Sequence, residues 1–478
     1  MHYNPITSVF YQTYLLQLEE YNLKRFNAVV QMSAGKTPTH LRKQIIWTPK
    51  LIGVFALAHF YRLLFALGIA LFFFPLTGLF FAVVVFIGFM YISALLFFLP
   101  LTLALYTISP VDTLVKKSLI NSAKKKLESY QDLKIIGIAG SFGKTTMKEV
   151  LATVLAEKFI VLKTPKNINT PLGISRQITT ELNHNTEIYI VEMGEYYPGD
   201  VATICAITPP HVAVVTGINE AHLEKMGTIE NTVKTIFEIV ENSKPDSTVI
   251  LNGDSPLVVK NYKQFVGNRK VLFFSKQNPT VTFHTDTLSI SFEITQKGKD
   301  PIRVQTKILG EYIVGDILAA FEIGQLLGMT LAEMSRGMAR IQPVEHRLQP
   351  IYNASTDVLV IDDSYNGNPD GVQEAIKVLS YFKRRRRVFI TPGLVETAEK
   401  NREIHYTIGK ELSAVADKVI LIKNSATPYI SEGLLENGFK KEDIIWFESA
   451  KEAHSRLGEI IKPKDVVLFQ NDWPDNYF

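Results

Sequence analysis

A glycine-rich stretch beginning at residue 140 carries the residue types and spacing best suited to chemistry in this chain. It follows an apolar, strand-like run at Lys134–Ala139 and leads into a helical stretch at residues 147–156. The residues of this stretch form a phosphate-loop pattern. They are Gly140, Ser141, Phe142, Gly143, Lys144, Thr145 and Thr146. Glycines let backbone N–H groups face phosphate oxygens, and a helix N-terminus adds positive potential. The pattern predicts a nucleotide site in which the Lys144 ammonium reaches the β- and γ-phosphates and the Thr145 hydroxyl holds Mg²⁺.

The elements that position this loop are indicated by alternating apolar strands and helices after residue 134. Ile138 stands where the common Walker spacing has its first glycine, but the strand before the loop and the helix after it supply the required context. The alternation predicts an α/β fold of parallel sheets with helices on both faces. We expect a phosphate-loop domain over residues 116–343 and a dinucleotide-fold-like (Rossmann-like) domain over residues 344–478, which close over the nucleotide at a hinge near Pro343.

The overall composition excludes several classes of protein. The 478 residues suffice for several domains, and 51 Lys and Arg against 47 Asp and Glu give a formal net charge of +4. This balance argues against binding nucleic acid by phosphate neutralisation. The single cysteine, Cys205, excludes a disulfide framework within one chain and a four-cysteine zinc module. The densest charge run, KRRRR at residues 383–387, is interpreted as a solvated turn rather than a contact for anionic lipid or phosphate.

An uncharged apolar segment accounts for the high mean hydropathy of +0.10. No Asp, Glu, Lys, Arg or His occurs from residue 63 to residue 111. At about 20 residues per crossing, the segment predicts two membrane helices at residues 51–74 and 79–108, joined by a turn at residues 75–78. Lys50 before it and Lys116 and Lys117 after it belong to a basic excess that places both flanks in the cytoplasm. We therefore predict that residues 1–115 anchor the chain in the cytoplasmic (inner) membrane, with the other domains in the cytoplasm.

Two further features accompany this segment. His59 and Arg62 lie inside the first predicted span, where packing or snorkelling is favoured over a functional intramembrane site. Before the span, apolar residues recur at helical spacing over residues 11–26 and predict an amphipathic helix. This helix either lies on the membrane surface or packs on the other domains.

A series of segments resembles, in the same order, motifs of the Mur ligase family, the ATP-dependent amide-bond ligases of peptidoglycan precursor synthesis. They cover residues 134–478 and are GIAGSFGKTT (137–146), TPKNINTPLGIS (164–175), VEMGEYYPGD (191–200), TGINEAHLEKMGTIENTVKTIFEI (216–239), VEHRL (344–348), VIDDSYNGNPDGV (360–372), TPGLVE (391–396) and NDWPDNY (471–477). The segment at residues 360–372 is most similar to the family members that add D-alanyl-D-alanine.

The resemblance implies an ATP-dependent acid–amino-acid ligase that forms ADP and uses Mg²⁺. Such an enzyme would activate a carboxylate as an acyl phosphate, which an amine then attacks with release of phosphate. The implied small-molecule substrates are a muramoyl-peptide carboxylate, in the first place UDP-MurNAc-tripeptide, and an amino acid or dipeptide such as D-Ala-D-Ala. The membrane segment stands where the family has a uridine-nucleotide domain, so a lipid-linked carboxylate precursor is an alternative.

The resemblance also implies roles for residues of the first α/β domain. Glu192, at the end of the apolar strand IYIVE, would hold a first Mg²⁺ together with Thr145. His222 would bind a second Mg²⁺ between the γ-phosphate and the acyl oxygen. Lys144, Glu192 and His222 would form the catalytic group. The polar loop before residue 171 would contact the carboxylate substrate through Asn167, Asn169 and Thr170.

In the second α/β domain the resemblance assigns Arg347 to a phosphate of ATP and Asp363 to the ribose hydroxyls. Asn366 and Asn368 follow an apolar strand in a loop that contains glycine and proline, where they would contact the incoming amine. A role in a turn is nearly as well supported for these two asparagines, because Asn-Gly and Asn-Pro favour turns.

Two positions depart from the family pattern. Ile236 stands where most members have a carbamylated lysine, and Lys234 lies about 200° away round the helix. Three explanations are open: the second metal is held differently, the helix is shifted so that it presents Lys234, or the activity is altered. Asp316 stands near the expected adenine site, where the family usually has imidazole and amide groups. These departures keep open a catalytically altered binding or regulatory membrane protein, and a third class is a membrane ATPase of another kind. The intact phosphate and metal residues favour the enzyme.

Overall fold

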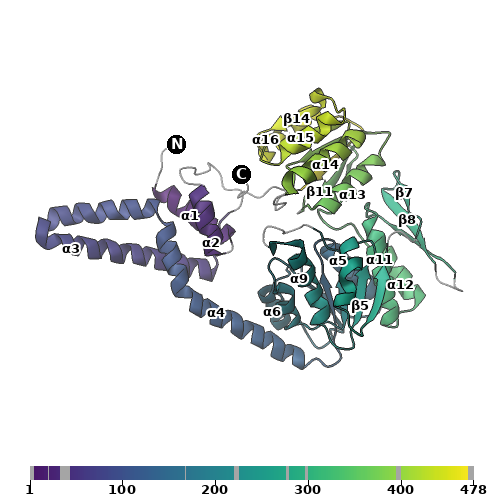
Figure 1. The fold of residues 1–478 in the computed structure, drawn as a ribbon, viewed down its shortest axis with the longest axis horizontal. Coiled ribbons are helices and arrows are strands. Elements are labelled where there is room, and N and C mark those ends of the chain that lie inside the picture. The colour runs from purple at the N-terminus through teal and green to yellow at the C-terminus, as the bar shows by residue number, and fades with distance from the viewer. Residues whose placement is uncertain are drawn as a thin grey trace. The chain divides into compact units, whose positions relative to one another are not determined.

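The computed structural model describes residues 5–19, 21–32, 44–166, 168–219, 226–275, 279–295, 300–365, 367–394 and 400–471. The chain forms two compact units, Met1–Ser118 and Leu119–Phe478. The first unit is helical, whereas the second contains three β-sheets with helices packed around them (Figure 1).

The first unit is built from a long helical hairpin and the helices that flank it. Thr48 caps the hairpin by accepting a hydrogen bond from the Leu51 N–H at 3.2 Å. The chain turns back at Gly78, whose φ of 76° and ψ of 175° are not helical, so two arms, Pro49–Leu76 and Gly78–Leu95, lie side by side (Figure 1). The predicted turn at residues 75–78 is confirmed. The helices are α1 Pro5–Leu18, α2 Leu23–Met32, α3 Pro49–Leu95 and α4 Phe98–Glu128, which continues into the second unit.

The second predicted membrane helix is interrupted. α3 ends at Leu95 and α4 begins at Phe98. Pro100 explains the interruption, because in an unbroken helix its ring would clash with the Leu96 carbonyl and it has no N–H to donate. The prediction of one continuous helix over residues 79–108 is therefore wrong.

The side chain of Gln12 in α1 pairs the backbone groups at this interruption. Its Nε2 donates to the Leu95 carbonyl at 2.7 Å, and its Oε1 accepts from the Phe98 N–H. Backbone groups in apolar surroundings require such partners. α1 and α2 share one apolar core with the hairpin. The single helix predicted over residues 11–26 is wrong, because the chain turns between α1 and α2 at Tyr21, whose φ is 62°.

The phosphate-loop domain is built on a six-stranded parallel sheet in the order β2-β3-β1-β4-β5-β6. Side chains of β1 alternate between its faces: Ile136 and Ile138 belong to one apolar core and Ile135 to another. Helices therefore cover both faces, as predicted. The strands are β1 Lys134–Ala139, β2 Val161–Lys163, β3 Ile188–Glu192, β4 Val212–Val215, β5 Thr248–Asn252 and β6 Lys270–Phe274; the helices are α5 Lys144–Leu155, α6 Pro171–Thr180, α7 Asp200–Cys205, α9 Ile229–Glu241, α10 Pro256–Asn261, η1 Tyr262–Gln264, α11 Tyr312–Leu326 and α12 Leu331–Ala339.

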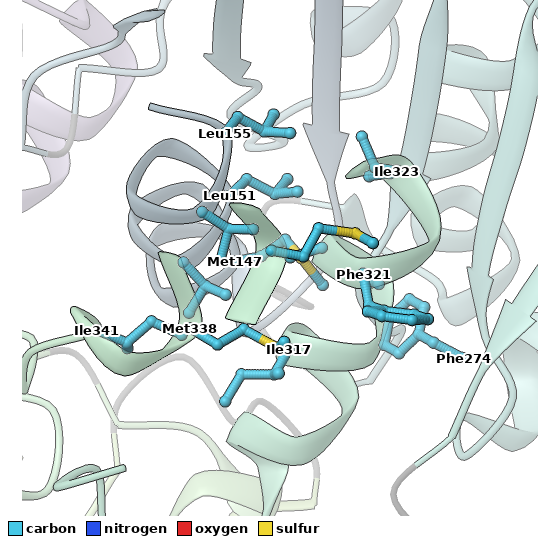
Figure 2. Packing of buried hydrophobic residues seen from close by; sticks show 14 of the residues in the cluster. Met147, Leu151, Leu155, Phe274, Ile317, Phe321, Ile323, Met338 and Ile341 are labelled. Atoms are coloured by element: carbon cyan, nitrogen blue, oxygen red, sulfur yellow. The ribbon is translucent and has the colours of Figure 1, made fainter. Parts of the chain in front are cut away.

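Helix α5, which begins at the phosphate loop, is held by one of these cores. Met147 and Leu151 of α5 lie among the same buried side chains as Ile317 and Phe321 of α11 (Figure 2). Burial of this kind contributes about 25 cal/mol per Å² of apolar surface. The helix start that carries Lys144 is therefore fixed by packing along α5 as well as by the loop itself.

The second α/β domain has a six-stranded sheet in the order β10-β11-β15-β12-β13-β14. Its β10 edge pairs antiparallel with β11, and the other pairs are parallel. A three-stranded antiparallel sheet, β7-β8-β9, precedes it along the chain. The alternation of strands and helices predicts the parallel sheets but not these antiparallel additions. The remaining elements are β7 Thr282–His284, β8 Ser289–Ile294, β9 Ile302–Thr306, β10 Gln349–Asn353, β11 Val358–Asp363, α13 Pro369–Ser380, β12 Arg386–Thr391, α14 Asn401–Val415, β13 Lys418–Ile422, α15 Thr427–Glu436, η3 Lys441–Asp443, β14 Ile444–Phe447, α16 Ala450–Ile460 and β15 Asp465–Gln470.

The basic run at residues 383–387 is more than a solvated turn. Its last three arginines are half-buried, and each pairs with an aspartate. The interpretation as a solvated turn is therefore wrong for these three, and it fits only the first two residues of the run, which are exposed. The pairs are Arg385–Asp357 at 2.8 Å, Arg386–Asp465 at 2.5 Å and Arg387–Asp417 at 3.0 Å.

Candidate active site

The phosphate loop lies at the carboxyl end of β1, which pairs with β3 on one side and β4 on the other. Gly140 has a φ of 148°, and a Cβ added there would lie 2.2 Å from Oγ1 of Thr216. Gly143, with a φ of 77°, directly precedes α5. The Ser141 N–H donates to the Gly217 carbonyl at 2.8 Å. The chain can follow this tight path only because glycines stand at its two left-handed positions.

The Lys144 side chain lies against this loop. Its ammonium donates to the Gly140 carbonyl and, at 2.7 Å, to Oε1 of Glu195. Glu195 is 3% exposed and lies just beyond the end of β3. A phosphate bound in the loop would compete with this carboxylate for the same ammonium. Glu195 is a site residue that the sequence motifs did not single out.

Glu192, the last residue of β3, is the centre of a buried polar cluster. Its Oε2 accepts hydrogen bonds from Oγ1 of Thr145 at 3.1 Å and from Nζ of Lys148 at 2.9 Å. Its Oε1 accepts from Nδ2 of Asn169 at 3.4 Å. Glu192 is 2% exposed and Lys148 is fully buried. The structure thus brings together three predicted site residues and adds Lys148, which sequence reasoning missed.

The Thr145 and Glu192 oxygens fit a magnesium ion. Neighbouring ligands of an octahedral ion with bonds of about 2.1 Å lie about 3 Å apart, and these two oxygens are 3.1 Å apart. Mg²⁺ often takes one or two carboxylates from the protein and completes its shell with water and substrate phosphates. The described residues contain no group of three or more His, Cys, Asp or Glu that could hold a metal. A magnesium ion here would therefore rely on phosphate oxygens for much of its shell.

The other predicted substrate residues differ in their placement. Thr170 and Asn368 are helix caps: the hydroxyl of Thr170 accepts from the Gly173 N–H at 3.3 Å, and Oδ1 of Asn368 accepts from the Gly371 N–H at 3.1 Å. Asn368 also lines the cavity described next, whereas Thr170 does not. Three predicted residues lie outside the described ranges, and they are Asn167, His222 and Asn366.

The second α/β domain supplies the opposite wall of one cavity. Asp363 ends β11, and its carboxylate accepts a hydrogen bond from the Leu348 N–H at 3.2 Å. Burial raises the pKa of this carboxyl to about 7, although the positive charge of Arg347 lowers it. Arg347 donates a hydrogen bond to the Tyr365 carbonyl at 3.0 Å. The Cζ of its guanidinium also lies over the aromatic ring of Tyr365, 4.6 Å from the ring centre. Both domains line the cavity, and the predicted site residues in its walls are Ser141, Phe142, Gly143, Lys144, Thr145, Thr146, Asn169, Glu192, Arg347, Asp363 and Asn368.

Helix α9 shows where the position of the family's carbamylated lysine lies. Ile236 is fully buried and belongs to the same apolar core as Val233 and Phe237. Lys234 is exposed and does not line the cavity. The shifted helix that would present Lys234 to a metal is therefore not seen. The other two explanations, a second metal held differently and an altered activity, are unaffected.

Asp316 on α11 is a buried acid in the wall of the cavity. It is 5% exposed, and its Oδ2 has no hydrogen-bond partner among the residues that the structure describes. Burial raises the pKa of this carboxyl well above its ordinary value. A protonated carboxyl offers one O–H donor beside a C=O acceptor, whereas a side-chain amide offers two N–H donors beside the same kind of acceptor. A protonated Asp316 could therefore supply one of the donors and the acceptor that an amide would offer at this position.

The Asp316→Asn variant is expected to be more stable than the native chain at pH 8 and nearly equal to it at pH 4. The folded protein keeps the Asp316 proton where the unfolded chain has lost it, so the free energy of unfolding falls as the pH rises above about 3.9. Asparagine has no such titration. We expect the free energy of unfolding of the variant to exceed that of the native chain by about 1–3 kcal/mol at pH 8. The difference is followed through the thermal midpoints of both proteins, measured without nucleotide. Glu293→Gln, at an exposed carboxylate of β8, is the control; an unchanged pH dependence in Asp316→Asn would contradict the prediction.

Known proteins share this pairing of a phosphate-loop domain with a second α/β domain. The first domain matches the Mur ligase middle domain over residues 138–324, and the second matches the Mur ligase, glutamate ligase domain over residues 346–470. These two domains define a class of ATP-dependent ligases. The chain belongs to the Mur ligase family, as its motifs predict. The unit Met1–Ser118 lies outside both matches.

Named relatives cover about 70% of the chain. The chain is 30% identical over 366 residues to the UDP-N-acetylmuramoyl-tripeptide–D-alanyl-D-alanine ligase of Mycobacterium leprae, covering 71% of each chain. It is 25% identical over 338 residues to the Bacillus subtilis protein of the same name, covering 70% of this chain and 72% of the relative. The crystal structure of the MurF ligase from Thermotoga maritima in complex with ADP is 28% identical, with a TM-score of 0.65 over 75% of this chain and 80% of that one.

Proposed function

We propose that this chain is an ATP-dependent ligase of peptidoglycan precursor synthesis that joins D-alanyl-D-alanine to the carboxylate of UDP-N-acetylmuramoyl-tripeptide. One observation carries the proposal: Lys144, Thr145 and Glu192 line the same cavity as Arg347 and Asp363 of the next domain. Relatives that cover 70% and 71% of this chain bear this activity in their names. In this proposal residues 116–343 and 344–478 act as the two catalytic domains.

The reaction has two steps. In the first, a carboxylate oxygen of the muramoyl peptide attacks the γ-phosphorus of ATP, which forms an acyl phosphate and releases ADP. In the second, the amine of the dipeptide attacks the acyl carbon and loses a proton, the amide bond forms, and inorganic phosphate leaves with the electron pair of the broken C–O bond. Both steps gather negative charge on phosphoryl oxygens, so cations and donors fixed in advance lower the barriers.

The residues of the cavity divide this work. The Lys144 ammonium exchanges its bond to Glu195 for one to a phosphate oxygen. The oxygens of Thr145 and Glu192 would hold Mg²⁺, which when bound neutralises charge on the phosphates. Arg347 brings a second protein cation from the opposite wall, where its guanidinium is held by Tyr365.

Four more roles follow the family pattern and belong to the same proposal. Asp363 contacts the ribose hydroxyls, and Asn169 contacts the carboxylate substrate beside Glu192. Asn368, at the N-terminus of α13, contacts the incoming amine. His222, which lies outside the described residues, would bind the second Mg²⁺.

The full-length protein in detergent tests the proposal through phosphate release from ATP with Mg²⁺, UDP-MurNAc-tripeptide and D-Ala-D-Ala. Release that requires both substrates, with the amide product detected by mass spectrometry, supports the ligase. Release that occurs only when a lipid-linked muramoyl peptide replaces UDP-MurNAc-tripeptide would support the ligase activity but assign it a different carboxylate substrate. No release with any pair, despite measurable ATP binding, would contradict the proposal and favour a catalytically altered binding or regulatory membrane protein.

The location of the protein is a further part of the proposal. Pro49–Leu76, Gly78–Leu95 and Phe98–Glu128 are helices long and apolar enough to cross a membrane. We propose that only the first two cross the cytoplasmic membrane. Lys50 at the start of α3 pairs with Asp112 of α4 at 2.9 Å, so α4 passes the base of the hairpin instead of following its arms toward Gly78. Two crossings leave both flanks on one side, and the lysine excess assigns that side to the cytoplasm.

Thiol labelling of sealed membrane vesicles tests this topology. A Ser118→Cys variant is expected to react with a membrane-impermeant maleimide in inside-out vesicles and not in intact cells. The native Cys205 gives little background, because it is buried and burial raises its pKa to about 12. Labelling in intact cells would place the flank on the outer side and contradict the proposal, and recovery of the protein in the soluble fraction would contradict the anchor itself.

A further inference from the structure

Lys148 is a fully buried lysine on the second turn of α5, directly beneath the phosphate loop. Its ammonium donates to Oε2 of Glu192 at 2.9 Å and to the carbonyl of Lys166. Its exposed fraction is 0%. Burying an ammonium is costly unless it is paired with an anion and fully hydrogen-bonded. The Glu192 carboxylate and the Lys166 carbonyl therefore offset the cost of burying the Lys148 ammonium.

The two partners of Lys148 belong to two different parts of the site. Glu192 is the carboxylate whose Oε2 also accepts from Thr145, in the arrangement that fits Mg²⁺. Lys166 belongs to the segment between β2 and α6, described at residues 164–166 and 168–170, which is proposed to bind the carboxylate substrate. One ammonium thus joins a candidate metal ligand to a candidate substrate loop.

Other hydrogen bonds fasten the same loop to the end of β3. The Glu192 N–H donates to Oγ1 of Thr164 at 3.1 Å. Asn169 donates its Nδ2 to Oε1 of Glu192 at 3.4 Å, and its carbonyl accepts from the Gly194 N–H at 2.8 Å. These bonds link neutral groups to the strand end or carboxylate. Lys148 alone among these partners adds a full positive charge, and it touches the loop and the carboxylate at once.

We propose that Lys148 is a positioning residue that aligns Glu192 for the metal and the loop at Lys166 and Asn169 for the carboxylate substrate. Binding of these two ligands is then coupled through one buried ammonium. The inference rests on the proposed function for the identity of the two ligands. It adds a residue, and a coupling between the two binding sites, that the family motifs do not assign.

A Lys148→Met variant removes the charge and keeps most of the side-chain volume. We expect Mn²⁺ to bind about 10–100-fold more weakly to its complex with a non-hydrolysable ATP analogue, measured as free Mn²⁺ by electron paramagnetic resonance, because loss of a residue that supports a metal ligand usually has this effect. Binding of UDP-MurNAc-tripeptide, measured by calorimetry, should weaken as well. Lys148→Arg, which keeps the charge, should restore part of both affinities.

Two comparisons separate positioning from a general loss of structure. Lys163→Met removes a half-exposed lysine of the same domain that pairs with Glu149, and it should leave both affinities unchanged. If Lys148→Met does not fold, the pair Glu192→Gln and Glu192→Gln/Lys148→Met replaces it, because the double variant leaves no unpaired buried charge. The double variant should then bind the tripeptide more weakly than Glu192→Gln, since it also loses the bond to Lys166.

Folded variants that bind Mn²⁺ and the tripeptide as the native protein does would overturn the inference and leave Lys148 a purely structural role. A native protein that binds both ligands but releases no phosphate would instead contradict the proposed function. The two failures are therefore distinguishable, because the Mn²⁺ and tripeptide measurements do not depend on turnover.

Discussion

Replacing Lys144 with alanine is expected to slow substrate-dependent phosphate release about a hundred- to a thousandfold, the usual effect of removing a fixed donor that stabilises developing negative charge. The Lys144 ammonium lies over the phosphate loop and is 12% exposed. It already pairs with the carboxylate of Glu195, so it is oriented toward an anion before the substrate arrives. Alanine removes the cation but leaves the glycines of the loop and the start of α5 in place.

The measurement is the steady-state rate of phosphate release by the full-length protein with both substrates. Lys234→Ala is the matched control, because it removes an exposed lysine from α9 of the same domain. We expect the control to retain the native rate. A Lys144→Ala protein that kept more than about a tenth of the native rate would contradict the role assigned to this ammonium.

Replacing Gly140 with alanine is expected to weaken ATP binding at least about tenfold, because each hydrogen bond to a charged group contributes about 1.5–3 kcal/mol. The added Cβ would lie 2.2 Å from Oγ1 of Thr216 and 2.9 Å from the Gly217 carbonyl. The φ of 148° at Gly140 is also one that residues with side chains rarely adopt. Either the loop or the end of β4 must move, and the N–H groups of the loop would no longer converge on a phosphate.

Gly199→Ala separates crowding from backbone strain in this experiment. Gly199 also has a positive φ, of 90°, but no atom lies within 4 Å of the position of its Cβ. We expect Gly199→Ala to bind ATP normally, with affinity and thermal midpoint measured for both variants. Native ATP affinity in a folded Gly140→Ala protein would show that the loop does not enclose the phosphates.

The site residues were predicted in two ways: Lys144 and Thr145 from local chain geometry, and Glu192, Asn169, Arg347 and Asp363 from the resemblance to family motifs. Lys144 and Thr145 follow a glycine-rich turn between a strand and a helix, and Glu192 ends a strand next to β1, where parallel strands present their carboxyl ends together. Lys148 was missed because a lysine on a helix usually faces water. Its burial depends on Glu192, which is remote in sequence, and the only local signal is its place beside Met147 on the buried face of α5.

The parts of the fold that follow from local sequence patterns were also predictable. Apolar strands alternating with helices were enough for two parallel sheets, because each such run has to be buried on both faces. The antiparallel β10 edge and the aspartate partners of the arginine run depend on contacts between distant segments, for which the local pattern gives no signal. The interruption after Leu95 is different, because Pro100 was present in the sequence as a local reason for it.

The hydrogen bonds of Gln12 make α1 and the helical hairpin a single unit that cannot be divided. A hairpin grafted onto another protein without α1 would leave the Leu95 carbonyl and the Phe98 N–H unpaired in apolar surroundings, at a cost of about 1–3 kcal/mol for each group. Because α1 precedes the hairpin along the chain, ribosomes synthesise Gln12 before the interruption that it satisfies. A hairpin transferred to another protein would therefore have to begin with α1, which supplies the hydrogen-bonding partner for its interruption.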